Sequence, residues 1–97
     1  MQAWVFFYTL KELDPKIRTK VRAQLYGKKQ QSNYGRYHYQ IKGLMPENSY
    51  IRPVKSVVIV KKRYGQKLCK FFEFNRVKYR LLEIIVDRSD FEKKPFL

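Results

Sequence analysis

Ala3 to Leu10 reads Ala-Trp-Val-Phe-Phe-Tyr-Thr-Leu, and Pro53 to Val60 reads Pro-Val-Lys-Ser-Val-Val-Ile-Val. These are the two most uniformly apolar segments in a chain of 97 residues. A strand that lacks polar alternation has both of its faces covered or in use, which is typical of a central position in a sheet. The sequence therefore predicts two central strands, over residues 3–10 and 53–60.

Two further segments are predicted as edge strands. Residues 36–42 alternate between apolar and polar side chains, as in a half-exposed strand. Residues 78–86 begin with the same alternation and end apolar, which indicates a last strand. Residues 28–35 are predicted as a loop, and residues 43–49 as a turn region punctuated by Gly, Pro and Asn.

Helix signals fall between these strands. Asp14 can cap free backbone N–H groups, and Pro15 is tolerated in a first turn. An apolar stripe recurs every four residues after them, and Gly27 offers a stop, so a helix is predicted over residues 15–26. That stripe consists of Ile17, Val21 and Leu25. A second helix is predicted over residues 64–75, with an apolar side formed by Leu68, Phe71 and Phe72.

The predicted order is strand, helix, strand, strand, helix, strand. With right-handed crossovers this order predicts an α+β, ferredoxin-like βαββαβ sandwich: a four-stranded antiparallel sheet with two helices on one face. The other face is expected to be solvent-exposed, a ligand platform or a dimer interface. We expect a single domain over residues 1–87 and a loosely held C-terminal tail over residues 88–97, which docks through Phe91 and Phe96.

Charge sets the class of partner. The chain carries 22 Lys and Arg against 8 Asp and Glu, a formal charge of +14. Self-repulsion at this density favours a polyanionic partner, with nucleic acid ahead of an anionic membrane because no broad apolar helix face accompanies the charge. One Cys and one His exclude a disulfide framework and a zinc-finger ligand set. We expect a cytoplasmic protein without a membrane span.

The most basic and aromatic stretch is the candidate binding surface. Residues 15–46 hold eight Lys or Arg and no carboxylate, with tyrosines such as Tyr26 and, just downstream, Tyr50 spaced through and beside them. Cations bind phosphates at any sequence, and aromatic rings stack on unpaired bases. In the alternative interpretation, Tyr37 and Tyr39 pack inward as the core face of their strand instead of stacking on bases. The predicted RNA-binding residues are Lys20, Lys28, Lys29, Tyr34, Arg36, Tyr37, His38, Tyr39, Lys42, Arg52, Lys61, Lys62 and Arg63.

No catalytic residue, metal site or cofactor is predicted. The four glycines stand singly, so no phosphate-binding loop can be written. The carboxylates are sparse, and Asp14 is explained as a helix cap. A dimeric Mg²⁺-dependent nuclease stays open as the alternative, since magnesium sites need only one or two carboxylates plus substrate phosphates.

Three resemblances accompany this interpretation. A basic ferredoxin-like sheet resembles the RNA-recognition motif, although residues 54–60 lack the aromatics of that family's third strand. Length and element order are similar to the small subunit of the CRISPR spacer-integration complex, but Thr9-Leu10 replaces that family's acidic residue, so its nuclease role does not carry over. Residues 32–39, 42–44 and 51–60 resemble a small uncharacterised archaeal family of basic proteins, over about two-thirds of the chain.

Size, charge and an aromatic-basic loop are also typical of lineage-specific ribosomal proteins. The sequence thus predicts a non-catalytic RNA-binding protein, a ribosomal protein or another ribonucleoprotein component that contacts rRNA. Its expected partners are RNA and neighbouring ribosomal proteins, with a homodimer left open.

Overall fold

The computed structural model of the chain describes residues 1–32, 37–41 and 43–92. Predictions that concern Tyr34, Arg36, Lys42 or Phe96 therefore lie outside the described residues.

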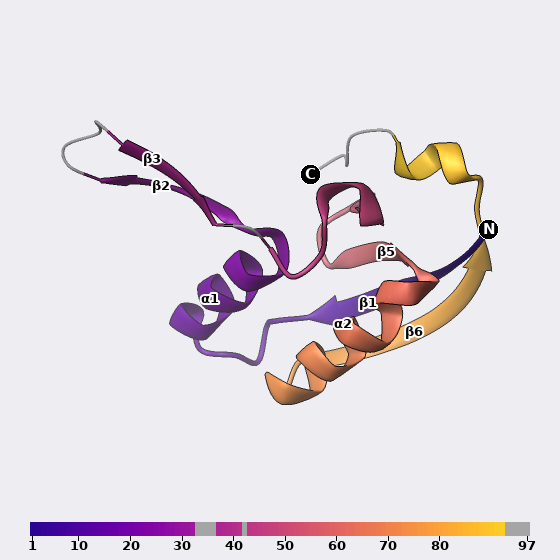
Figure 1. Cartoon of the computed structure of the whole chain (residues 1–97). Helices are drawn as coiled ribbons and strands as arrows, with labels where there is room; N and C mark the ends of the chain where they lie inside the picture. Colours follow the sequence, from indigo (N-terminus) through magenta and orange to yellow (C-terminus); the bar gives the residue numbers. More distant parts are fainter. Residues whose placement is uncertain (33–36, 42, 93–97) are drawn as a thin grey trace.

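The architecture is α+β, with one four-stranded antiparallel sheet and two α-helices (Figure 1). The sheet has the order β4-β5-β1-β6, formed by β1 (Gln2–Thr9), β4 (Tyr50–Ile51), β5 (Val57–Lys61) and β6 (Lys78–Ile85). All three strand pairs are antiparallel. The prediction that the two most apolar segments form the central strands is confirmed by β1 and β5.

The apolar sequence of β1 is explained by its position, because side chains on both of its faces are buried. Trp4, Phe6 and Tyr8 share the face on which the aromatic rings of helix and sheet meet, and Phe6 is fully buried. On the other face, Ala3 and Val5 are also buried. A segment buried on two sides has no place for polar alternation.

Helix α1 (Pro15–Tyr26) has the predicted bounds. The Asp14 side chain accepts a hydrogen bond of 2.9 Å from the backbone N–H of Lys16, so the predicted cap is confirmed. Gly27 ends the helix with a φ of 77°, a conformation that glycine adopts without steric cost. Of the predicted stripe, Val21 and Leu25 are buried, whereas Ile17 is 46% exposed.

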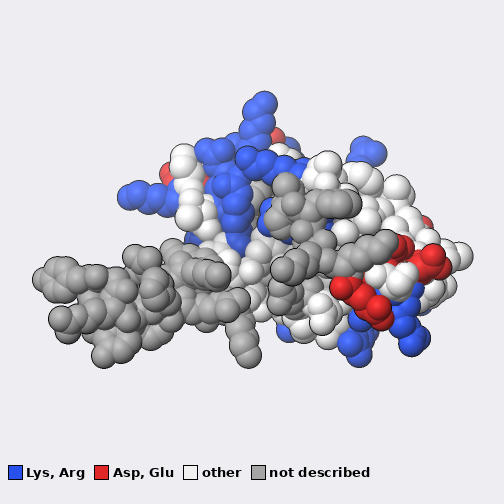
Figure 2. Space-filling model, turned by 90° about the horizontal axis from the view of Figure 1, so that it is seen from above, with Lys and Arg blue, Asp and Glu red and all other residues white. Residues whose placement is uncertain are grey.

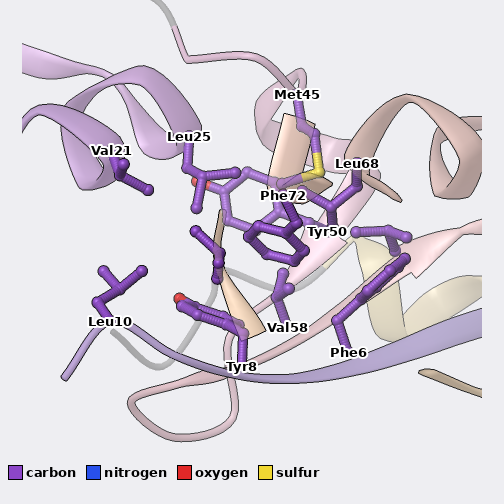
Figure 3. Packing of buried hydrophobic residues seen from close by; sticks show 12 residues of the cluster. Phe6, Tyr8, Leu10, Val21, Leu25, Met45, Tyr50, Val58, Leu68 and Phe72 are labelled. Carbon is purple, nitrogen blue, oxygen red and sulfur yellow. The ribbon is translucent and has the colours of Figure 1, made fainter. Parts of the chain in front are cut away.

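Helix α2 (Lys62–Phe74) begins two residues before the predicted start. Its inner side holds Leu68 and Phe72, both fully buried, as the pattern predicted. Phe72 lies at the centre of an aromatic cluster (Figure 3). Its ring centroid is 5.8 Å from that of Phe6, 5.1 Å from that of Tyr8 and 5.4 Å from that of Tyr79. Val21 and Leu25 of α1 extend the same core.

The predicted edge strand over residues 36–42 is wrong in its placement. Strand β3 (Tyr37–Ile41) pairs with β2 (Lys28–Ser32) in a separate two-stranded sheet, and residues 28–32 had been predicted as a loop. This hairpin projects away from the rest of the molecule (Figure 1). Pairing between segments so close along the chain costs less loop-closure entropy than joining the distant sheet. The polar sequence Lys-Lys-Gln-Gln-Ser also offers little to bury in a core.

The short strand β4 occupies the sheet edge instead. It follows the 3₁₀ helix η1 (Glu47–Ser49) and pairs Tyr50 with Val60. Tyr50 and Met45 are both buried in the core, so this connection is a packed part of the body. Strand β5 begins only at Val57, because residues 53–56 form a turn rather than the first half of the predicted strand.

The second sheet face is partly covered by the 3₁₀ helix η2 (Arg88–Phe91). Phe91 is buried, with the Lys61 Nζ atom 5.6 Å from its ring centroid, so the predicted docking through Phe91 is confirmed. Phe7 and Leu82 on the same face remain 44% and 57% exposed.

Candidate nucleic-acid interface

A basic pocket lies where the end of β1, helix α1 and the connection between β4 and β5 meet. Its volume is about 180 Å³. The residues that line it are Tyr8, Thr9, Leu10, Lys11, Arg18, Arg22, Arg52, Lys55 and Ser56. Five of them are cationic, and none is a carboxylate. We call this site the basic pocket.

The basic pocket is a place of uncompensated positive charge. Within the part of the chain that the structure describes, none of its five cations forms an ion pair. Elsewhere on the surface, Lys78 pairs with Glu12 at 2.9 Å. Figure 2 shows Lys and Arg side chains gathered densely on one side of the visible face, with the largest visible group of Asp and Glu at the other end. Like charges brought together in this way repel one another until an anion neutralises them.

Arg52 is the most firmly positioned of these cations. Its guanidinium carbon lies 3.7 Å from the centroid of the Tyr26 ring, a stacked cation–π contact. The Tyr26 hydroxyl shares a hydrogen bond of 2.7 Å with the Tyr8 hydroxyl. Burial raises the pKa of Tyr26 above its ordinary value of 10.0, and the neighbouring Tyr8 raises it further. Tyr26 is therefore a neutral, anchored platform for Arg52.

This arrangement corrects two expectations about the tyrosines. Tyr26 packs against the core and carries Arg52 on its ring, and Tyr50 is buried at a ring distance of 5.5 Å from it. From the sequence, both are predicted to be available to stack on bases. Neither offers an open ring, because their aromatic surface is used within the body.

Arg52 also has a polar atom without a partner. Its Nε is buried and makes no hydrogen bond with the described residues. A buried donor left in this state costs free energy unless a ligand or water satisfies it.

Ser56 contributes a second unusual feature at the rim of the basic pocket. Its φ is 69°, in the left-handed region that residues with a Cβ atom rarely adopt. Its carbonyl oxygen accepts a hydrogen bond of 3.0 Å from the backbone N–H of Tyr8, which fixes the turn against β1. Glycine would hold this conformation without strain. Serine at this position keeps a hydroxyl group but adds backbone strain. Thr9 lines the pocket beside it, and its Oγ1 accepts a 3.2 Å hydrogen bond from the backbone N–H of Lys11.

The predicted Lys61-Lys62-Arg63 triplet lies elsewhere, across the end of β5 and the start of α2. Lys62 Nζ donates a 3.0 Å hydrogen bond to Gln2 Oε1, and the Arg63 guanidinium lies 5.0 Å from the Tyr64 ring centroid. With Met1, Gln2 and Arg88, the triplet lines a broad hollow of about 500 Å³. The triplet therefore forms a second basic surface, separate from the residues that line the basic pocket.

The other predicted residues divide between helix and hairpin. Lys20 is exposed on α1. Lys28 and Lys29 lie on β2, and Tyr37, His38 and Tyr39 lie on β3, where Tyr37 pairs with Ser32. Of the predicted residues in the described range, the basic pocket contains Arg52 alone.

The predicted RNA-binding residues omit Lys11, Arg18, Arg22 and Lys55, although Arg18 and Arg22 lie within the candidate binding surface over residues 15–46. One signal was present, because Arg18 and Arg22 are four residues apart and so share a face of α1. Nothing local indicated that this face would meet residues 52–56, since that juxtaposition is set by how α1 packs against the sheet.

The described residues bring together no group of three or more His, Cys, Asp or Glu that could hold a metal ion. Cys69 is a half-buried free thiol on α2. Within the same described part, none of the helices combines the length and the apolar character that crossing a membrane requires. Comparison with family models, curated proteins and solved structures gave no match.

Proposed function

We propose that the protein is a non-catalytic RNA-binding protein that holds RNA phosphates in the basic pocket. The observation that carries this proposal is the convergence of five cations from three segments, with no carboxylate among the lining residues. The cations of such a site repel one another when it is empty, and together they attract an anion strongly from solvent. The charge of +14 adds a long-range attraction to any polyanion.

The projecting β2–β3 hairpin supports RNA over a smaller anion. It carries Lys28 and Lys29 on one strand and the Tyr37-His38-Tyr39 run on the other. A basic and aromatic arm suits irregular or single-stranded RNA, in which phosphates and unstacked bases are both accessible. Helix α1 uses Val21 and Leu25 for the core, which argues against a helix devoted to reading a DNA groove.

We propose further that the protein works in the cytoplasm as a component of a ribonucleoprotein such as the ribosome, with rRNA as its ligand. Support comes from the small body, the charge and the projecting β2–β3 hairpin, and it is support by analogy with small basic ribonucleoprotein components. The fold fits a ferredoxin-like sandwich in which the second strand is reduced to β4 and the hairpin is inserted before it.

RNA affinity measured across a salt series tests the function. The logarithm of the association constant should fall by roughly 0.7–0.9 per phosphate contact for each logarithmic unit of salt. The double variant Lys28→Gln, Lys29→Gln should lower both the affinity and this slope, because two phosphate-binding cations are removed from the arm.

The matched control is Lys67→Gln, Lys70→Gln, which removes the same charge from the exposed side of α2. Its salt slope should stay closer to that of the parent protein. Affinity that is unchanged between low and high salt, or no measurable binding to any structured or single-stranded RNA, would contradict the proposed function.

A further inference from the structure

We infer that the basic pocket recognises a phosphate monoester at the end of an RNA strand, in preference to the phosphodiesters within the strand. This inference rests on the proposed function and specifies the chemical group that the pocket takes. It is argued from the charge, the polar groups and the shape of the site.

Charge is the first argument. A phosphodiester carries one negative charge, whereas a terminal monoester carries about 1.5 to 2 at pH 7, because its second pKa is about 6. The five cations of the basic pocket are matched better by the more highly charged group. No carboxylate lines the pocket to offset them.

Hydrogen-bond donors are the second argument. A terminal phosphate presents three unesterified oxygens, each an acceptor, and an internal phosphodiester presents two. The guanidinium groups of Arg18, Arg22 and Arg52 supply planar donor pairs, and Thr9 and Ser56, which also line the pocket, each carry a hydroxyl. The Thr9 oxygen already accepts from the Lys11 N–H, so its hydroxyl hydrogen is available to donate.

Pre-organisation is the third argument. Tyr26 holds the Arg52 guanidinium in place, and the hydrogen bond between Tyr8 N–H and Ser56 oxygen fixes the turn that carries Ser56. Retaining a serine at φ 69° preserves a hydroxyl in the pocket where glycine would be less strained. A guanidinium held in place beside one small volume favours a compact end group over a chain that must pass through.

The test compares short single-stranded RNAs of one sequence that carry a 5′-phosphate, a 3′-phosphate or hydroxyls at both ends. Each competes with the same internally labelled RNA for the full chain. We expect an RNA with a terminal phosphate to bind about tenfold tighter or more than the unphosphorylated RNA, the gain of one added charge-assisted hydrogen bond. The preference should shrink as the pH falls below about 6, where the monoester loses its second charge.

Variants assign this preference to the basic pocket. Arg22→Gln, Lys55→Gln removes two exposed cations from the pocket and should abolish the preference. Lys67→Gln, Lys70→Gln removes the same charge from α2 and should retain it. Ser56→Gly should weaken the preference while raising the stability of the fold, because it removes both the hydroxyl and the strain.

The outcomes separate the two proposals. Equal affinity for the three RNAs, with salt-dependent binding intact, overturns the terminal-phosphate inference and leaves the proposed function standing. Absence of RNA binding overturns both. Inorganic phosphate, at an ionic strength matched with chloride, should compete far more weakly than the phosphorylated RNA; if it competes equally well, the site binds a small free anion and the inference is overturned.

Discussion

Gly65 shows how one residue decides the approach of a helix to the sheet. It is buried in α2, and a Cβ atom added there would overlap the ring of Trp4 on β1. The helix can therefore lie directly against the indole only because this position has no side chain. Glycine lowers helix propensity by roughly 0.5–1 kcal/mol relative to alanine, so the close packing must more than offset that cost.

Gly65→Ala is expected to destabilise the protein by about 1–3 kcal/mol, because overpacking against Trp4 outweighs the gain in helix propensity. Urea unfolding followed by circular dichroism measures the change. Gln66→Ala, at the next and exposed position of the same helix, is the matched control and should be neutral or slightly stabilising. Stabilisation by both substitutions would show that Gly65 does not determine the packing.

Tyr26 allows a prediction about alkaline pH. Burial raises the pKa of its phenol in the folded protein, so the unfolded chain ionises first as the pH rises above about 10. The unfolded state then binds fewer protons than the folded state, and stability falls with rising pH in this window. In Tyr26→Phe this contribution is absent. Unfolding free energies of the two proteins, measured from about pH 8 to about pH 11, should differ in slope above about pH 10. Parallel curves would contradict the assignment.

At the scale of elements, the two sides of α2 contribute unequally to the stability of the fold, because only one side packs in the core. Phe72 is fully buried among the rings of Phe6, Tyr8 and Tyr79, whereas Phe74, two residues later, is 87% exposed. The two residues are chemically identical and lie in the same helix, so their comparison isolates burial.

Phe72→Ala should lower the free energy of unfolding by about 3–5 kcal/mol, through lost transfer free energy and the cavity left behind. Phe74→Ala should change it by no more than about 0.5 kcal/mol, as expected for a surface site. Denaturant midpoints of the two variants make the measurement. Equal losses would mean that Phe74 is covered in solution and that this side of α2 is an interface.

The hairpin is the element that the sequence described least well. Alternation in residues 36–42 did indicate a strand, and β3 is one. Its partner was misassigned, because alternation reports that a segment is extended and leaves open which segment it pairs with. The Tyr50–Ile51 edge strand is too short to produce a pattern of its own.

At the scale of the whole molecule, charge opposes the fold. The five cations of the basic pocket and the triplet at the start of α2 are held on a body with only 8 carboxylates. Salt shortens the range of this repulsion, since the Debye length falls from about 30 Å at 0.01 M to about 8 Å at 0.15 M.

The melting temperature of the free protein should therefore rise as sodium chloride is added over this range. Arg22→Gln, Lys55→Gln should melt at a higher temperature than the parent protein at low salt, and its melting temperature should depend less on salt, because two repelling cations are gone. Differential scanning calorimetry measures both effects. A melting temperature independent of salt would show that repulsion among these cations is unimportant.

The sequence by itself determined the local features of this protein: the bounds and cap of α1, the inner face of α2, the central positions of β1 and β5, and the excess of positive charge. Each follows from periodicity, capping chemistry or composition, which act over a few residues or over the chain as a sum. Tertiary structure alone decided that β3 pairs with β2, that Tyr26 carries Arg52, and that Lys11, Arg18, Arg22 and Lys55 meet in one pocket. The first is a choice of partner that strand alternation leaves open. The other two join segments distant along the chain, and the shared core that places those segments has no local signature.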